Sequence, residues 1–187
     1  MRLFVALDLN EEIRGALRDL IAILKPLGAT ARWSRPEGVH VTLKFIGHVD
    51  PSKLGAIRAA LAAVRSSASA QMRVRGVGFF PDERRPRVLW CGVDASANLA
   101  PLAAEIERGL EPLGIPREDR EFTPHLTLAR LKESRGDDRL VRAAQELKSR
   151  DFGSALADEF HLFESFTKPS GAEYKKIESY PFAKGAM

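Results

Sequence analysis

The sequence predicts a two-lobed protein built from both helices and strands. Strand and helix signals follow each other in a similar order in the two halves of the chain. Two tetrapeptides share the pattern His-x-Thr-apolar, HVTL at 40–43 and HLTL at 125–128, and each lies in a predicted strand. Each strand is followed by a turn and a helix with an Arg-Ala-Ala triplet, at Arg58–Ala60 and Arg142–Ala144. An internal duplication explains these repeats and predicts two equivalent strands facing each other across a cleft.

The first half carries clear signals at the ends of its elements. Asn10 offers an N-cap oxygen to the helix that follows the first strand, and Pro26 with Gly28 ends that helix. Pro51 opens a second helix, because proline fits well in a first helical turn. The expected elements are, in order, a strand over Leu3–Leu9, the helix that ends at Pro26, an extended piece at Arg32–Trp33, a strand over Val39–Ile46, the helix from Pro51, and strands over Met72–Phe80 and Arg87–Val93.

The second half repeats this layout. A helix is expected over about Ser96–Leu113, and the second motif strand covers His125–Leu131. A further helix covers about Asp137–Lys148. The chain closes with two strands, Glu159–Phe166 and Glu173–Tyr180, which pair around the turn KPSGA.

Composition and charge set limits on function. The chain has 187 residues and a formal net charge of +4, with 29 Lys and Arg. This mild basic excess suits an anionic substrate but does not by itself establish nucleic-acid binding. The single cysteine, Cys91, excludes an internal disulfide and a zinc site built from several thiolates. Cys91 lies in the apolar run RVLWCGV, so we interpret it as a small buried hydrophobe. The length fits one domain, and we expect residues 1–187 to form a single two-lobed domain.

No targeting or membrane segment is recognisable. The N-terminal stretch MRLFVALDLN has an apolar run broken by Asp8 and lacks the cleavage site of a signal peptide. No stretch approaches the ~20 apolar residues that a membrane-spanning helix needs. We therefore expect a cytoplasmic protein without membrane association.

The repeated tetrapeptide suits acid–base chemistry. Side chains alternate along a strand, so the His and the Thr of each motif point to the same face. Two facing copies bring together His40, His125, Thr42 and Thr127. One neutral imidazole can take a proton from water while the other, protonated, gives one to a leaving oxygen. The hydroxyls can hold phosphoryl oxygens, and Arg130 can supply a cation. Hydrolysis of a phosphodiester fits this set of groups and needs no metal or other cofactor.

Two other interpretations of the motifs are weaker. Two histidines are too few for a metal site, and no acidic residue lies at strand spacing beside either one. A purely structural role would suit one lone His on a strand, but it does not explain two copies in matching contexts. The remaining histidines, His48 and His161, do not share the pattern, and we interpret them as structural or surface residues.

Longer stretches around the motifs resemble a known family. The segments are ARWSRPEGVHVTLKFIG, GVGFFPDERRPRVLWCGV, HLTLAR and LFESFTKPSGAEYKKI. Together they are similar to the bacterial and archaeal RNA 2′,3′-cyclic phosphodiesterases, also known as 2′-5′ RNA ligases, of the two-histidine phosphoesterase superfamily. The resemblance extends from Leu3 to Phe182.

The resemblance implies an α+β fold of two pseudo-symmetric lobes, with antiparallel sheets lining a central cleft and helices outside. It also implies metal-independent hydrolysis of RNA 2′,3′-cyclic phosphate ends to 2′-phosphomonoesters. In that scheme His125 accepts a proton from water and His40 donates one to the departing 3′ oxygen. Thr42, Thr127 and Arg130 match phosphate-binding positions of the family.

RNA contacts are harder to assign from sequence. Aromatic faces can stack on bases, and Trp33 is a candidate for such a contact. Strand alternation gives Phe45 the same direction as Leu43, so we expect Phe45 to face the core. Tyr174 is interpreted as structural, with a place at the rim of the cleft as the alternative. The basic turn PDERRPR at 81–87 is expected to be a solvated hairpin tip, which can guide RNA if it overhangs the cleft.

Several other functions fit the same residues. Joining of RNA through a 2′-5′ bond needs the same two histidines as hydrolysis. The same chemistry also suits small cyclic nucleotides or ADP-ribose 1″,2″-cyclic phosphate. A module that only binds RNA ends would not need an acid–base pair. We expect an RNA substrate with a cyclic phosphate or a 2′-5′ linkage, no obligate protein partner and a monomeric chain.

Overall fold

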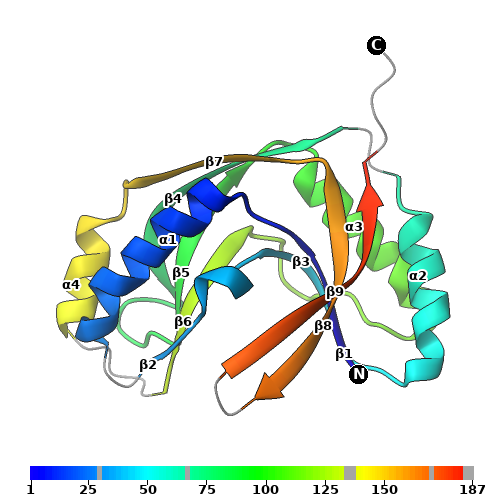
Figure 1. The fold of residues 1–187 in the computed structure, drawn as a ribbon, viewed down its shortest axis with the longest axis horizontal. Coiled ribbons are helices and arrows are strands. Elements are labelled where there is room, and N and C mark those ends of the chain that lie inside the picture. Colours follow the sequence, from blue (N-terminus) through cyan, green and yellow to red (C-terminus); the bar gives the residue numbers. More distant parts are fainter. Residues whose placement is uncertain (29–30, 66–67, 133–137, 169–170, 183–187) are drawn as a thin grey trace.

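Two antiparallel sheets form the framework of the computed structural model (Figure 1). The structure describes residues 1–28, 31–65, 68–132, 138–168 and 171–182. The four-stranded sheet has the order β3-β1-β8-β9 and consists of β1 (Arg2–Leu7), β3 (Val41–His48), β8 (Glu159–Lys168) and β9 (Gly171–Pro181). The five-stranded sheet has the order β2-β6-β5-β4-β7 and consists of β2 (Ala31–Trp33), β4 (Ala70–Phe80), β5 (Val88–Ala95), β6 (His125–Leu131) and β7 (Asp151–Ala157).

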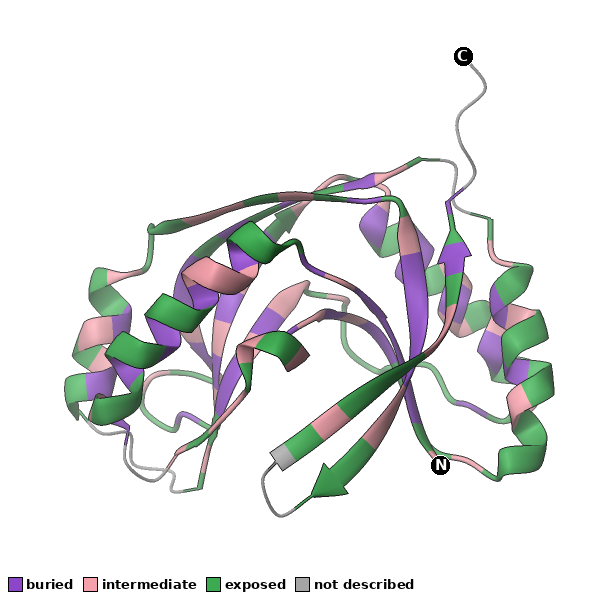
Figure 2. Ribbon diagram, viewed as in Figure 1, coloured by how far each residue is buried: buried purple, intermediate pink, exposed green. Residues whose placement is uncertain are grey.

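The helices cover the outer faces of the two sheets and bury their apolar sides against them (Figure 2). Helices α1 and α4 contact the five-stranded sheet through β7 and β4, while α3 contacts β3 and α2 contacts α3 and β9. The Asn10 side chain accepts a hydrogen bond from the Ile13 amide, which confirms the predicted cap. The helices are α1 (Glu11–Leu24), α2 (Leu54–Ala62), α3 (Leu99–Leu110) and α4 (Asp138–Glu146), with short 3₁₀ turns at Lys25–Leu27, Pro36–Gly38, Pro51–Lys53 and Glu111–Leu113.

The predicted α+β class and the antiparallel sheets are confirmed, and the predicted elements differ from the observed ones mainly at their ends. One strand, β7, was not predicted. Its sequence DFGSALA is poor in large apolar residues, and Gly153 interrupts it with a φ of 112°. It is an edge strand whose pairing with β4 joins residues far apart in the chain. Residues 169–170 of the predicted KPSGA turn and Asp137 of the predicted fourth helix lie outside the described residues.

The two sheets do not correspond to the two halves of the chain. The four-stranded sheet joins the N-terminal strands β1 and β3 to the C-terminal strands β8 and β9. If the short strand β2 is left aside, the five-stranded sheet has the order β6-β5-β4-β7, which can be compared with β3-β1-β8-β9 in the other sheet. The two motif strands, β3 and β6, then occupy corresponding edge positions. The repeat in sequence is thus a repeat in strand position, although the chain crosses between the sheets to build it.

A β-bulge follows each His-x-Thr motif at the same position. On β3, Thr42 pairs with Ala6 and Lys44 pairs with Val5, so Leu43 is the extra residue. On β6, Leu128 is the extra residue between Thr127 and Ala129. A bulge adds one residue to a strand and reverses the alternation beyond it. The third residue after each Thr therefore points to the same face as the Thr.

The prediction that Phe45 faces the core is wrong, and the bulge at Leu43 is the reason. Phe45 is 53% exposed and pairs with Phe4 on β1. Its ring lies 6.4 Å from the Phe4 ring, on the face that also carries Ala6 and Phe163. Simple alternation fails because it does not allow for the extra residue.

The same bulge turns Lys44 into the interior. Its side chain is 1% exposed, and Nζ donates to Glu107 Oε1 at 2.8 Å and to the Pro116 carbonyl at 2.7 Å. Burial of a charge requires such partners, because an unpaired buried ammonium is strongly unfavourable. Lys44 therefore fastens β3 to α3 and to the segment that precedes the second motif.

Candidate active site

Both motif histidines are held by the same backbone contact. Nδ1 of His40 lies 2.7 Å from the carbonyl oxygen of Gly38, and Nδ1 of His125 lies 2.8 Å from that of Thr123. A carbonyl only accepts hydrogen bonds, so Nδ1 carries the proton in each neutral ring. Nε2 is then the nitrogen left to act as a base, or as an acid once it is protonated. Both neutral imidazoles are thus held in the tautomer that carries its proton on Nδ1.

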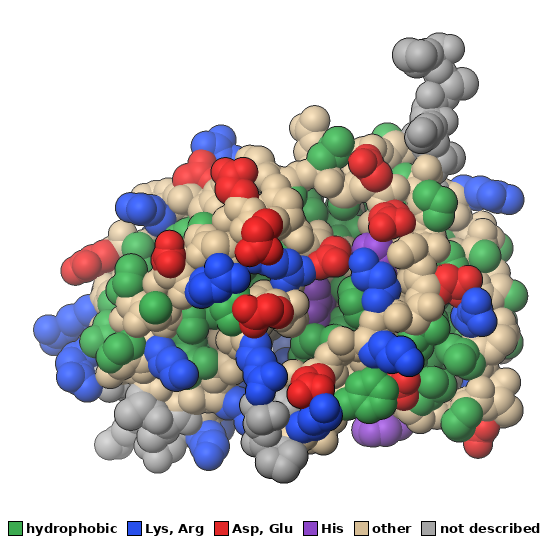
Figure 3. All heavy atoms as spheres, viewed as in Figure 1, with side chains coloured by type: hydrophobic (Ala, Val, Ile, Leu, Met, Phe, Trp, Pro, Cys, Tyr) green, Lys and Arg blue, Asp and Glu red, His purple; other side chains and the backbone are tan. Residues whose placement is uncertain are grey.

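The motif strands lie next to each other. β3 and β6 are in contact between the two sheets. Thr42 and Thr127 are both partly exposed, on the sheet faces set by their pairing with Ala6 and Trp90. The space-filling view shows histidine side chains in a hollow at the centre of the molecule, edged by charged side chains (Figure 3).

Aromatic rings surround His40. Its imidazole stacks on Phe4 with 4.5 Å between ring centres, and Tyr174 meets it edge-on at 5.1 Å. Burial lowers the pKa of His40 from the ordinary 6.5 to about 4, although the hydrogen bond to Gly38 opposes the change. His40 is therefore neutral in the free protein at neutral pH.

His125 has a more open setting. Phe80 meets its ring edge-on at 5.1 Å, and His125 lines a cavity of about 1040 Å³. The two motif histidines therefore share a backbone anchor but not an environment.

Arg130 reaches the face of the second motif because of the bulge at Leu128. It pairs with Val88, two residues from Trp90, whose partner is Thr127. Its charge acts on Tyr174, where it opposes the rise in pKa that burial causes. Tyr174 lies beside His40 and is 39% exposed. The structure thus places Tyr174 at the rim of the site, beside His40 and within the electrostatic influence of Arg130.

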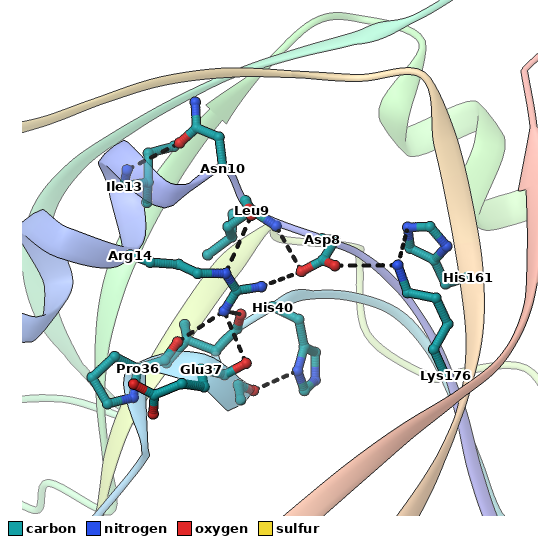
Figure 4. A network of polar contacts seen from close by, with 12 residues as sticks. Asp8, Leu9, Asn10, Ile13, Arg14, Pro36, Glu37, His40, His161 and Lys176 are labelled. Atoms are coloured by element: carbon teal, nitrogen blue, oxygen red, sulfur yellow. Dashed lines mark hydrogen bonds and ion pairs between the residues drawn. The ribbon is translucent and has the colours of Figure 1, made fainter.

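A polar network lies behind His40 (Figure 4). Arg14 on α1 forms an ion pair with Asp8 and donates hydrogen bonds to the carbonyls of Pro36 and Glu37 at 2.9 Å. It thereby holds the segment that ends at His40. Asp8 also meets Lys176 at 3.3 Å, and Lys176 Nζ lies 3.4 Å from Nε2 of the buried His161.

Other residues singled out in the sequence lie outside this group. His48 is exposed at the end of β3, and His161 is 2% exposed with Nδ1 2.9 Å from Ser179 Oγ. Cys91 is buried, and burial raises its pKa to about 12, which confirms the interpretation as a small hydrophobe. Trp33 packs against the main core and donates to the Gly28 carbonyl at 3.4 Å.

Several residues around the two histidines were not predicted from the sequence, and the reasons differ between them. Phe4 and Arg14 lie on a predicted strand and helix with no motif to mark them. Trp90 follows from the pairing of β5 with the second motif strand, which sequence alone does not show. Asp82 and Arg84 of the basic turn line the cavity beside His125, so this hairpin tip borders the site.

Two features are absent from the described parts of the chain. No group of three or more His, Cys, Asp or Glu side chains is placed there to hold a metal ion. Within the same residues, no helix has both the length and the apolar character needed to cross a membrane.

The arrangement can carry out phosphoryl chemistry. Two imidazoles with open Nε2 atoms provide a base and an acid. The hydroxyls of Thr42 and Thr127 and the guanidinium of Arg130 can bind non-bridging oxygens. These features define a phosphoesterase class that relies on paired histidines.

Comparison with known proteins agrees with this class. The sequence model of the family described as LigT like Phosphoesterase matches residues 7–90 and 92–174. The chain belongs to this family. It is 32% identical over 181 residues to an RNA 2′,3′-cyclic phosphodiesterase of Methanothermobacter thermautotrophicus, with 96% of this chain and 98% of that protein covered. A protein of the same name from Archaeoglobus fulgidus is 33% identical over 180 residues, with 96% and 99% covered.

Solved structures share the fold. The crystal structure of TT0787 of Thermus thermophilus superimposes with a TM-score of 0.83 and 30% sequence identity, and all of both chains is covered. Escherichia coli LigT in complex with 3′-AMP gives a TM-score of 0.79 at 24% identity, with 98% of each chain covered.

Proposed function

We propose that the protein hydrolyses RNA ends that carry a 2′,3′-cyclic phosphate and leaves a 2′-phosphomonoester, without a metal ion. The observation that carries this proposal is the pair of equivalently anchored histidines on neighbouring strands. The names of the relatives from M. thermautotrophicus and A. fulgidus support the same substrate. The mild positive charge of the chain suits an RNA end.

Each site residue has a role in the proposed reaction. His125 takes a proton from water, whose oxygen attacks phosphorus. The bond between phosphorus and the 3′ oxygen breaks, and His40 protonates that oxygen. Thr42, Thr127 and Arg130 bind the non-bridging oxygens, whose charge grows in the transition state.

The donor role of His40 depends on bound substrate. With a pKa of about 4, His40 carries a proton in only about one molecule in a thousand at pH 7. A phosphodiester anion beside the ring favours the charged form and raises this pKa. In the free protein the neutral ring can only accept a proton at Nε2, so the bound phosphodiester is what makes His40 a donor.

The first experiment measures turnover of a short RNA with a 2′,3′-cyclic phosphate in the presence of EDTA. We expect a 2′-phosphate product, and a rate loss on the order of 10²–10⁴-fold in His40→Ala and in His125→Ala. His48→Ala is the matched control, because His48 lies on β3 but is exposed outside the site. Absence of turnover by the unmutated protein, or full activity in either motif variant, would contradict the proposal.

A second substrate assigns the acid and the base. When sulfur replaces the 3′ bridging oxygen, the departing thiolate needs no proton, because a thiol has a pKa of about 8.5. His40→Ala should then regain most of its lost rate, while His125→Ala should not. The reverse pattern would exchange the two roles.

The proposed enzyme acts as a single chain. One chain supplies both motifs, which supports a single two-lobed domain acting as a monomer without an obligate partner. We place the protein in the cytoplasm, a compartment in which a free thiol such as that of the buried Cys91 is retained.

A further inference from the structure

A chain of polar contacts runs along the four-stranded sheet beside His40 (Figure 4). Nζ of Lys176 on β9 donates to the Asp8 carboxylate at 3.3 Å and lies 3.4 Å from Nε2 of His161 on β8. Nδ1 of His161 lies 2.9 Å from Oγ of Ser179. The charge of Asp8 acts on His40, so this group lies close to the site. The proposed reaction gives neither Lys176 nor His161 a role.

Strand register turns Lys176 toward the site. Lys176 pairs with Phe163, which in turn pairs with Phe4 on β1. The Phe4 ring stacks on His40, and directly paired side chains share one face of a sheet. A register shift makes Ile177 an extra residue on β9. Without this bulge Ile177 would occupy the face of the site, and Lys176 would point away from it.

His161 fixes the ammonium group of Lys176 as an acceptor. The residue is 2% exposed, and burial together with the charge of Lys176 lowers its pKa, so the ring is neutral at neutral pH. A neutral imidazole accepts at one nitrogen and donates at the other. Nε2 therefore accepts from Lys176, and Nδ1 donates to Ser179. An ammonium has three hydrogens, of which His161 and Asp8 engage two, and the Lys176 side chain is 40% exposed to a ligand.

One carboxylate serves two cations in this group. Asp8 forms ion pairs with both Arg14 and Lys176. Glu159 lies 3.8 Å from Nε2 of His161, so it contacts the imidazole rather than the ammonium, and it is 46% exposed to water. Lys176 therefore has no carboxylate of its own among the described residues. An anion on the exposed side of its ammonium would supply the missing charge.

The ammonium lies within reach of a second phosphate of the substrate. Thr42 and His161 both pair with Ala6, so they form one row across β3, β1 and β8. Neighbouring strands are ~4.8 Å apart, so this row spans about 10 Å. Lys176 reaches over the row toward Asp8, which shortens its separation from the phosphate held at Thr42. In RNA the next negative group lies one ribose away, at the 5′ oxygen of the terminal nucleoside.

We propose that Lys176, held by His161 and Asp8, binds the phosphate on the 5′ side of the terminal nucleoside. This contact rests on the proposed function and narrows its substrate class. It favours RNA ends whose last nucleoside carries a 5′ phosphate over nucleosides with a free 5′-hydroxyl. The Phe163 ring, 5.9 Å from Nζ, supports the ammonium from the sheet side. Lysine binds phosphate as a point charge, so the contact does not depend on the base.

Three substrates separate this contact from the chemistry. Adenosine 2′,3′-cyclic phosphate has a free 5′-hydroxyl, and its 5′-phosphorylated form adds a phosphate alone. The dinucleotide ApA with a 2′,3′-cyclic phosphate end adds a phosphodiester and a further nucleoside. The unmutated protein should hydrolyse the two substrates that carry a 5′ phosphate with a kcat/KM about tenfold above that for the first.

Replacement of Lys176 by glutamine should remove this preference. We expect kcat/KM to fall about tenfold on both substrates that carry a 5′ phosphate and to stay within about twofold on the 5′-hydroxyl substrate. Lys176→Arg should keep part of the preference, because it keeps the charge. Lys175→Gln is the matched control. It changes the net charge equally, but Lys175 is exposed and alternation directs it to the opposite face of β9.

The outcomes distinguish this contact from the proposed function. Equal kcat/KM for the three substrates in the unmutated protein would overturn the assignment of Lys176. An equal loss on all three in Lys176→Gln would also overturn it, because Lys176 would then act through His40. A preference for the dinucleotide alone would assign the gain to its second nucleoside instead of the phosphate. Failure of the unmutated protein to hydrolyse any of the three would overturn the proposed function.

Discussion

At the scale of single residues, the two motif histidines share an anchor and differ in what surrounds them. The carbonyl two residues before each ring fixes Nδ1 as a donor. Phe4 and Tyr174 then bury His40, whereas His125 borders an open cavity. An almost symmetric pair of motifs therefore places its two imidazoles in different surroundings, and burial lowers the pKa of His40.

Replacement of Tyr174 by alanine should raise the pKa of His40, because water would replace a ring that buries it. In the proposed reaction the histidine pair carries one proton, so protonation of both rings abolishes activity. The acidic limb of the kcat/KM profile should lie near pH 4 in the unmutated protein and move upward in Tyr174→Ala.

Titration of the His40 ring by NMR and the pH profile of kcat/KM check this shift together. Phe166→Ala is the control, because Phe166 is similarly exposed on β8 at 40%. The explanation fails if the acidic limb of Tyr174→Ala stays near pH 4, or if the control moves it equally.

At the scale of elements, helix α1 positions the first motif from a distance. The guanidinium of Arg14 joins the end of β1 to the 3₁₀ turn at Pro36–Gly38. That turn supplies the Gly38 carbonyl that orients His40. Arg14 on α1 therefore sets the orientation of the His40 ring, although it forms no direct hydrogen bond with that ring.

Replacement of Arg14 by lysine should lower kcat by about 10- to 100-fold, because an ammonium cannot reach several carbonyls in one plane and the turn would shift. KM should change less, since no group of Arg14 is assigned to substrate. Steady-state kinetics on the cyclic phosphate measure both constants. Arg18→Lys is the control, as Arg18 is exposed one turn further along α1. Equal kinetics in the two variants would show that the turn keeps its position without Arg14.

At the scale of the whole molecule, burial of ionisable groups makes stability depend on pH. The pKa of His40 falls from 6.5 to about 4 on folding. Between these values the unfolded chain binds a proton that the folded chain does not, so the free energy of unfolding decreases as the pH falls. Asp8 acts in the same direction at lower pH. Burial tends to raise its pKa, but the Leu9 amide and Arg14 outweigh burial and lower it.

Thermal unfolding at several pH values between 7 and 4 tests this linkage. The melting temperature should fall on acidification, and it should fall less in His40→Gln, which has no group to titrate at that position. His48→Gln should behave like the unmutated protein, because His48 is exposed. The same pH dependence in all three proteins would show that another group dominates.

The sequence by itself determined most of the elements and the chemical groups of the site. Caps, prolines and apolar periodicity depend on near neighbours in the chain, and the Asn10 cap forms as predicted. The His-x-Thr repeat is equally local, because strand alternation places both side chains on one face. These features were readable because their causes lie within a few residues.

Only the tertiary structure decided the features that depend on pairing between distant segments. The bulges at Leu43 and Leu128 exist because each motif strand carries one residue more than its partner, and they reverse the predicted direction of Phe45. Trp90 joins the site through its pairing with Thr127, and β7 forms through its pairing with β4. Hydrogen-bond register between strands is a non-local property, so periodicity within one strand could not supply it.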